Sequence, residues 1–488
     1  MRQNNRLVQY LATLAVSLAA ATQGISSAWP TPVLAKFHDN ETSIQITDNE
    51  MSWVVAMSSP GFVAGSVLTR YWADRAGRRA TLLASAVPVI MGTTVVIFAR
   101  VPWLLYITRF LWGISTGFIS IAVGMYVAEI ADKEIRGTLS LITRYMFNFG
   151  SLLVMSIGSF VSYEVLNYLL LVFPIICLVA CYFIPESPYF LLKDGKVEKA
   201  RKSLAIIRRY KDQKMLEDEL LQLRADVRKD MRRSGSVKEL FTGKAYRKAL
   251  IIATGLKVSQ LLTGSLTIQQ FLGRIMQQSG AAVPLSTVFI VFGAVRFLVC
   301  VVSSLLADRA GRRPLLVWSY LGTALSLFVV GLYFFLLDVV QLDKDSLRPY
   351  GFVTFAGIIA ANVISTLGYN SIIILIPAEI FPMNIKAVAL TYLSILGGVL
   401  SFAMSRGYQI IKKDLGLCGV FWIFSLVAVA GTIFSYLMVP ETKGKSLAEI
   451  QQMLQGAEYD DEVEEGLNRP PSDNEKNEVV QELKEIKP

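Results

Sequence analysis

The sequence has few of the residues from which soluble enzymes build reactive sites. Of its 488 residues one is histidine and four are cysteine. Charged side chains make up 18% of the chain, against about 25% in a typical soluble domain. The cysteines all lie in apolar runs, without the spacing of a redox or metal site. This composition excludes a disordered chain, a soluble enzyme and a disulfide-stapled scaffold, and it predicts no metal site and no cofactor.

The chain has long uncharged stretches instead, and crossing a bilayer takes about 20 mostly apolar residues. Two windows, 249–273 and 275–307, are each interrupted by one cation. Ten further windows contain no Asp, Glu, Lys or Arg: 7–35, 51–69, 80–99, 110–128, 145–163, 165–185, 314–337, 349–378, 387–405 and 415–440. Because all are too long for barrel strands, they predict an all-α membrane protein with twelve transmembrane helices.

A basic segment separates the first six windows from the last six. Residues 185–248 contain 18 Lys/Arg and 10 Asp/Glu, and the loop 70–79, on the same side, carries four arginines. Positively charged loops stay in the cytoplasm, so both chain termini are expected to be cytoplasmic. The loop 36–50, on the other side, contains Asn40-Glu41-Thr42, which predicts glycosylation of Asn40. A glycosylated membrane protein follows the secretory route, with the plasma membrane as the default destination.

These features predict four regions. An N-terminal six-helix bundle covers 1–184, a basic helical linker 185–248, a C-terminal six-helix bundle 249–440, and a cytoplasmic tail 441–488. The end of the tail, 458–488, holds 11 acids and four bases and little apolar surface. Such a composition is typical of a disordered segment.

Three motifs of the first bundle recur in the second in the same order. Asp74-Arg75-Ala76-Gly77-Arg78-Arg79 returns as Asp308-Arg309-Ala310-Gly311-Arg312-Arg313, Ala128-Glu129-Ile130 as Ala378-Glu379-Ile380, and Pro185-Glu186-Ser187 as Pro440-Glu441-Thr442. Arg136 corresponds to Lys386 at the spacing of the second motif. Such a repeat implies two halves related by a pseudo-twofold axis along the membrane normal, with a solute site between them near mid-membrane.

With these motifs, and with Gly24-Ile25-Ser26-Ser27-Ala28-Trp29-Pro30-Thr31-Pro32 in the first helix, the chain resembles the sugar-porter branch of the major facilitator superfamily. The resemblance covers roughly residues 7–450 and is strongest to insect facilitated trehalose carriers and animal facilitative glucose carriers. It implies the major facilitator fold with a cytoplasmic helical linker and transport by alternating access.

The resemblance also implies a cytoplasmic gate built from the repeated motifs. Arg78 and Arg79 would reach Glu379 of the other half, and Arg312 and Arg313 would reach Glu129. These bridges would form when the cytoplasmic side is closed and break when it opens. The remaining members of the gate would be Asp74, Arg75, Arg136, Asp308, Arg309 and Lys386. Several such pairs together can bias a two-state equilibrium.

Proton-coupled relatives carry an aspartate in the first helix, where this chain has about Ser26. The window 7–35 holds no acid, and a buried carboxylate is the usual proton carrier. No phosphate-binding Gly-rich motif occurs either. Facilitated diffusion is therefore the expected mode.

The resemblance marks Gln260, Thr263 and Asn370 as candidate solute contacts. Other positions depart from the family pattern: Leu261 and Leu266 replace polar residues, and the stacking tryptophan before Asn370 is missing. Each unpaired buried hydroxyl costs about 1–3 kcal/mol. A neutral sugar therefore finds fewer partners here than in typical relatives.

Three cations lie where the predicted helices cross the membrane: Arg144, Lys257 and Arg296. At about 1.5 Å per residue they lie roughly 12–18 Å from the nearest cytoplasmic charge. Each costs about 2.5–3.5 kcal/mol on insertion scales. Such residues usually face a cavity, although they can also snorkel or bond to carbonyls. If two of them face the cavity, an anionic solute becomes plausible.

The favoured function is facilitative transport of a small solute, with a sugar such as trehalose or a hexose first. The alternatives are a diverged carrier of a small organic anion and a non-transporting sensor, which the intact gate motifs disfavour. No nucleophile–base pair suggests an enzyme. The expected partners are the solute and the bilayer, with no nucleic acid and no obligate protein partner. The spacing Gly113-x-x-x-Gly117 is typical of close helix packing.

Overall fold

The computed structural model describes residues 6–39, 42, 44–132, 134–209, 213–232, 237–341, 348–445 and 447–455. The predicted glycosylation site Asn40, the side chain of Asp308 and the acidic segment 458–488 lie outside what it describes. The described residues are almost entirely helical.

The first half of the molecule contains eight helices: α1 (Leu7–Ala28), α2 (Pro30–His38), α3 (Asp48–Ala56), α4 (Ser58–Ala76), α5 (Arg78–Phe98), α6 (Pro102–Ile130), α7 (Arg136–Gly158) and α8 (Tyr163–Tyr182). Local signals fix several of their starts. Pro30 and Pro102 occupy the first turns of α2 and α6, where a missing N–H costs nothing. Thr47 and Glu50 form a capping box at the start of α3.

Four helices of the linker follow: α9 (Pro188–Lys193), α10 (Val197–Arg208), α11 (Gln213–Arg232) and α12 (Val237–Thr242). The second half contains α13 (Lys244–Leu262), α14 (Ser265–Gln270), α15 (Leu272–Ser279), α16 (Leu285–Ala310), α17 (Arg312–Asp338), the 3-10 turn η1 (Arg348–Tyr350), α19 (Phe352–Leu367), α20 (Tyr369–Ile380), α21 (Met383–Met438) and α22 (Leu447–Gln455).

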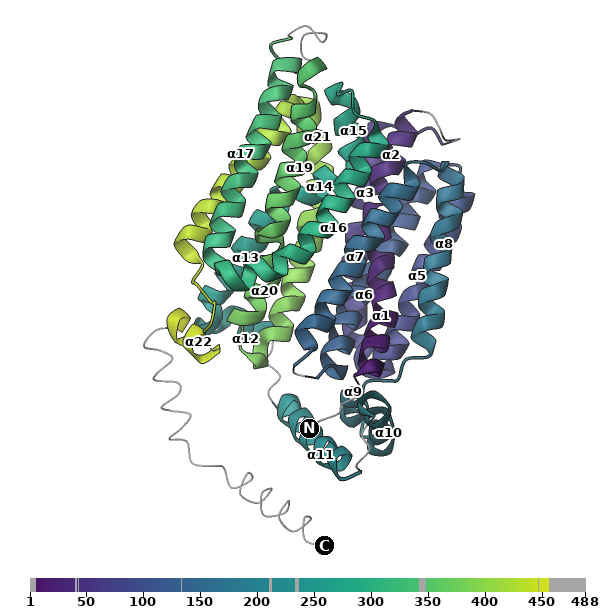
Figure 1. Cartoon of the computed structure of the whole chain (residues 1–488), viewed down its shortest axis with the longest axis vertical. Coiled ribbons are helices and arrows are strands. Elements are labelled where there is room, and N and C mark those ends of the chain that lie inside the picture. Colours follow the sequence, from purple (N-terminus) through teal and green to yellow (C-terminus); the bar gives the residue numbers. More distant parts are fainter. Residues whose placement is uncertain are drawn as a thin grey trace.

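Figure 1 shows the two halves side by side as bundles of long, roughly parallel rods. Helices α9, α10, α11, α12 and α22 lie at one end, called here the linker face, and α2 and α15 lie toward the other end, the opposite face. Eleven helices in the described residues are long and apolar enough to span a membrane. The longest, α21, is interrupted at Gly416, whose φ is 70°. It therefore contains two of the predicted spans, so all twelve are present.

The structure corrects the shape of several spans. Window 7–35 is divided between α1 and α2 at Trp29, and window 349–378 between α19 and α20 at Gly368. Window 249–273 breaks at Gly264, which has a φ of 73°. The window expected to begin at 275 begins at Leu285 instead, because Gly280 ends α15 and Pro284 caps the start of α16. Apolar composition alone does not show where a buried backbone bends.

Close helix contacts hold each half together. In the pair α4–α6, Gly61 and Gly65 face Gly113 and Gly117, as the glycine spacing predicts. A Cβ on Gly113 would lie 2.2 Å from the carbonyl oxygen of Ser58. Without side chains at these positions the two backbones come into direct contact, which is how membrane helices associate without a hydrophobic driving force.

Replacing Gly113 with alanine should therefore destabilise the protein by about 1–3 kcal/mol, because the new methyl group overpacks the α4–α6 contact. Gly124 lies in the same helix with nothing within 4 Å of its Cβ position, so Gly124→Ala is the matched control. Thermal unfolding in detergent should show a lower midpoint for Gly113→Ala alone. Equal midpoints for the two variants would contradict the close contact.

Candidate functional site

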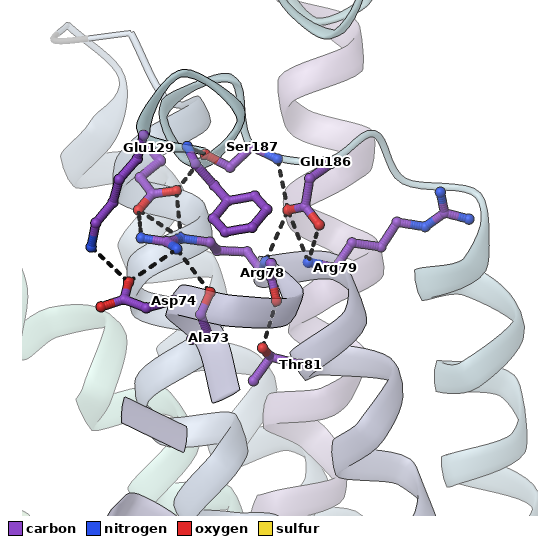
Figure 2. A network of polar contacts seen from close by, with 11 residues as sticks. Ala73, Asp74, Arg78, Arg79, Thr81, Glu129, Glu186 and Ser187 are labelled. Carbon is purple, nitrogen blue, oxygen red and sulfur yellow. Dashed lines mark hydrogen bonds and ion pairs between the residues drawn. The ribbon is translucent and has the colours of Figure 1, made fainter. Parts of the chain in front are cut away.

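The first repeated motif forms a buried ion-pair cluster at the linker face. Arg78, at the start of α5, donates from Nε to Glu129 Oε1 and Oε2 at 2.9 and 3.0 Å (Figure 2). Its Nη1 donates to the carbonyl oxygen of Ala73 at 3.0 Å. The Arg78 side chain is only 2% exposed. This guanidinium therefore ties the end of α4 to the end of α6.

The segment after α8 completes this cluster. The Glu186 carboxylate accepts the backbone N–H groups of Arg78 and Arg79, at 2.9 and 3.1 Å from Oε1. Ser187 donates its hydroxyl to Glu129 (Figure 2). Glu186 thus caps the N-terminus of α5, where free N–H groups and the helix dipole favour a negative charge. Gly77 makes the turn possible with a φ of 97°.

The second half repeats this arrangement. Arg312 Nη2 lies 3.1 Å from Glu379 Oε1, and Thr442 donates to Glu379 Oε2 at 2.6 Å. Glu441 accepts the backbone N–H groups of Arg312 and Arg313 at 3.0 and 3.1 Å. Even the flanking contacts recur, because Arg79 donates to the carbonyl of Tyr182 and Arg313 to that of Tyr436.

The cap at Glu441 is electrostatically favourable. Burial raises the pKa of this carboxyl, but the N–H groups of Arg312, Lys443 and Arg313 lower it further, so the pKa lies below its ordinary value. A carboxyl with a lowered pKa contributes stability above its unfolded-state pKa and loses that contribution as the pH falls through the folded-state value.

The predicted pairing between the halves belongs to the state in which the linker side is closed, and it remains a prediction, because the ion pairs of this conformation lie within each half. Arg78 pairs with Glu129 and Arg312 with Glu379, each inside its own half, and Arg79 and Arg313 donate to backbone carbonyls instead. The reason is reach: α5 begins beside the end of α6 in the same bundle, so the nearer of the two equivalent acids takes the arginine.

The other predicted gate residues also lie at the linker face. Asp74 forms an ion pair with Lys193, with 2.9 Å between Oδ1 and Nζ. Lys386 donates to the carbonyl of Ala378 at 2.6 Å. The carbonyl of Arg309 accepts a hydrogen bond from Lys443 at 2.6 Å. Arg75 and Arg136 are exposed. Glu186, Ser187, Glu441 and Thr442 were not predicted as cluster members, although their recurrence after the last helix of each half was the available signal.

A cavity of about 480 Å³ lies between the two halves. Helices α1, α6 and α7 line it from the first half, and α13, α14, α16, α19 and α20 from the second. Five of the six predicted solute contacts lie in its wall: Arg144, Lys257, Gln260, Arg296 and Asn370.

Hydrogen bonds connect these five side chains to neutral groups. Gln260 Nε2 donates to Asn370 Oδ1 at 3.0 Å, and Lys257 Nζ donates to Gln260 Oε1 at 3.3 Å. Arg144 Nη2 donates to the hydroxyl of Ser371 at 2.7 Å across the interface between the halves.

Thr263 is the exception among the predicted contacts. It is fully buried, and its hydroxyl donates to the carbonyl of Gln260 at 2.6 Å and lies 3.3 Å from the Tyr369 hydroxyl. It does not line the central cavity, because the break at Gly264 follows directly and turns this residue into the packed interior of the second half.

A second cavity of about 300 Å³ adjoins the first and shares Lys257, Leu261 and Leu266 with it. Its wall includes Arg109, a buried cation that was not predicted from the sequence, although it directly precedes an uncharged window. Arg109 donates to the carbonyls of Ser26 and Val54 at 2.5 and 3.2 Å. It therefore pins α1 and α3 to α6.

The halves are joined by polar contacts near the opposite face. Arg274 Nη2 lies 2.8 Å from Asp48 Oδ1. Arg406 Nη1 donates to Asn49 Oδ1 at 3.1 Å, and its guanidinium lies 4.2 Å from the ring centroid of Trp53. Together these contacts close the opposite end of the interface.

Toward the linker face the cavity wall is open. Gly124 of α6 and Ile374 of α20 line the cavity, and Ile374 is 61% exposed. The charged clusters at this face bind within their own halves. The central cavity is therefore accessible from the linker face in this conformation.

A family model described as "Sugar (and other) transporter" matches residues 18–454. The facilitated trehalose transporter Tret1 of Anopheles gambiae is 30% identical over 450 residues, covering 92% of this chain and 56% of the relative. The Tret1-2 homolog of Drosophila simulans is 29% identical over 457 residues, covering 93% of this chain and 92% of the relative. The chain thus spans little more than half of the first relative and nearly all of the second.

Solved structures support the fold. The proton:xylose symporter XylE bound to 6-bromo-6-deoxy-D-glucose superposes with a TM-score of 0.72 at 21% identity, covering 92% of this chain and 100% of that one. An inward-open structure of XylE from E. coli gives 0.72 at 20% identity, with 90% and 98% covered. These likenesses confirm the predicted major facilitator fold.

Glu129→Gln should destabilise the protein by about 3 kcal/mol, because it leaves the buried Arg78 charge with only its longer, 3.5 Å contact to the exposed Asp74. Glu379→Gln is the matched comparison: Arg312 is 13% exposed and Glu379 27%, so water compensates and the loss should be smaller. Thermal unfolding in detergent measures both. A larger loss for Glu379→Gln would show that burial does not set the strength of these pairs.

Asp48→Asn should loosen the opposite face, because Arg274 loses its ionic partner. A loss of about 1 kcal/mol makes opening roughly fivefold more frequent. The readout is the rate at which an impermeant maleimide, added from the opposite face, labels a cysteine introduced at Gln270. Glu164→Gln removes an exposed acid at the same face, in α8, and is the control. Unchanged labelling in Asp48→Asn would mean that this pair does not hold the face closed.

Proposed function

Because the chain belongs to the sugar (and other) transporter family, as its repeated motifs predict, we propose that it carries a small polyhydroxylated solute by alternating access. The observation that supports this most directly is the cavity between the two halves. Polar contacts close it at the opposite face, while its linker-face side is open. A rocking motion of the halves about such a cavity would expose it to each side in turn.

We assign the linker face to the cytoplasm, so this conformation faces inward. The basic linker and the arginine-rich loop 70–79 favour this orientation. Both termini are then cytoplasmic, and Asn40 faces the secretory lumen, consistent with the plasma membrane as the location.

The proposed mode is facilitated diffusion. Among the described residues that line the two cavities, none is Asp or Glu. The position where proton-coupled relatives carry an acid is occupied by about Ser26, whose hydroxyl donates to the carbonyl of Thr22 at 3.0 Å. No carboxylate in the described cavity wall can therefore carry a proton with the solute.

The two linker-face clusters serve the cycle by making each half move as a unit. Arg78 and Arg312 are bound inside their own bundles, so pairing across the interface would require breaking both of these contacts. The exposed cations Arg75, Arg136 and Arg309 remain the candidates for contact between the halves when the linker face closes. We therefore propose that the gate consists of the two rigid linker-face clusters, one in each half, and of these exposed cations.

Uptake into proteoliposomes of the purified full chain tests this function. Labelled trehalose or a labelled hexose should enter saturably, be displaced by excess unlabelled solute, and enter at the same rate with and without an imposed proton gradient. Protein-free liposomes are the control. Uptake driven uphill by the gradient would overturn the uniport assignment, since the described cavity wall offers no proton carrier.

A further inference from the structure

The central cavity carries a positive charge that no described acidic side chain neutralises. Arg144 of α7, Lys257 of α13 and Arg296 of α16 come from both halves, and all three line the same 480 Å³ space. None of the described lining residues is acidic. The wall therefore holds three cations facing a cavity between the halves that is open on its linker-face side.

The partners of these cations are all neutral. Arg144 donates to the Ser371 hydroxyl at 2.7 Å, Lys257 to the amide oxygen of Gln260 at 3.3 Å, and Arg296 to the amide oxygen of Gln269. None of the three forms an ion pair with a described residue. Arg144 and Arg296 line the same cavity, so their like charges repel one another. An arrangement of this kind is unfavourable until a counter-charge enters.

Neither snorkelling nor a purely structural role accounts for the three cations. Snorkelling would carry the charged ends to the membrane surface, but these side chains are half-buried in the cavity wall. A structural pin would satisfy its charge on carbonyls, as Arg109 does with Ser26 and Val54. Lys257 and Arg296 instead bond to Gln260 and Gln269, which also line the cavity, and Arg144 bonds to a neutral hydroxyl, that of Ser371.

From this geometry we infer that the transported solute is an anion: a polyhydroxylated body that carries a carboxylate or a phosphate. The inference rests on the proposed transport function and names its substrate class. Arg144, Lys257 and Arg296 bind the charged group, and Gln260 and Asn370 bind hydroxyl groups. Guanidinium groups suit both anions, because each presents paired oxygens to their N–H donors. The cavity volume lies in the range that small ligands occupy.

The charge also explains how loading could control the cycle. Closing the linker face around an empty cavity would remove water from three unpaired cations. Closing the linker face around an anion buries the three cations together with a charge that neutralises them. The loaded carrier should therefore reorient faster than the empty one, which predicts that solute on the far side of the membrane accelerates uptake.

Three labelled probes with the same hexose body test this inference: glucuronate, glucose 6-phosphate and glucose, with trehalose beside them. Each is offered to proteoliposomes of the full chain at imposed membrane potentials of either sign. At least one anion should enter saturably, faster when the lumen is positive, and at least about tenfold faster than glucose. Uptake of glucuronate alone would identify a carboxylate, and uptake of glucose 6-phosphate alone a phosphate.

Arg144→Gln and Arg296→Gln should each lower anion uptake about tenfold, because each removes a charge-assisted bond. Arg100→Gln is the control, since it removes an exposed cation from the connection between α5 and α6, outside the cavity wall. Anion-induced thermal stabilisation of each variant in detergent separates lost binding from lost folding.

Saturable glucose or trehalose uptake that neither anion inhibits, and that Arg144→Gln retains, would overturn the anion inference and leave the transport function standing. If a monodisperse protein that unfolds cooperatively takes up none of the four probes, both the inference and the proposed function fail.

Discussion

The buried pair between Arg78 and Glu129 is the constraint on which the first half depends. One guanidinium holds the end of α4 through the carbonyl of Ala73 and the end of α6 through Glu129. Glu186 caps α5 from the beginning of the linker. Removing any of these groups would leave a buried charge or free helix N–H groups. The same construction in the second half makes each bundle a stiff body at its linker-face end.

If each half is stiff, the interface between them must absorb the conformational change. Its polar contacts are of a weaker kind. Asp48, which pairs with Arg274, is 47% exposed, and Arg406 is held by amide, hydroxyl and ring contacts rather than by an acid. Exposed pairs of this type contribute about 0–1 kcal/mol each. A closed opposite face is therefore stable enough to be populated and weak enough to open.

The sequence predicted most of the fold, because membrane spans can be recognised by their length and lack of charge. It did not predict the breaks at Trp29, Gly264 and Gly368, since an uncharged window reads the same whether its helix is straight or bent. It also could not choose between Glu129 and Glu379 as the partner of Arg78. Duplicated motifs offer each arginine two equivalent acids, and only the packing of α5 against α6 decides between them.

In the cavity, the positions of the charges were predicted, but the direction of one polar side chain was not. The depths of Arg144, Lys257 and Arg296 followed from the helical rise alone, and all three line the central space. Thr263 does not line this space, because its orientation depends on the helix break that follows it at Gly264. Charge placement in a membrane protein is thus more predictable than side-chain direction, since a mid-membrane cation has few favourable places to go.

In a transporter of this fold, the polar and charged groups of the cavity wall must find partners in two conformations that differ greatly in their access to water. A neutral polar wall can exchange water for solute hydroxyls at little cost in either state. A wall with three unpaired cations cannot, because the state that excludes water is penalised unless a counter-charge is present. Two stiff halves around such a wall couple solute charge to reorientation, and a small set of charges near mid-membrane can then decide both which solute binds and when the carrier turns over.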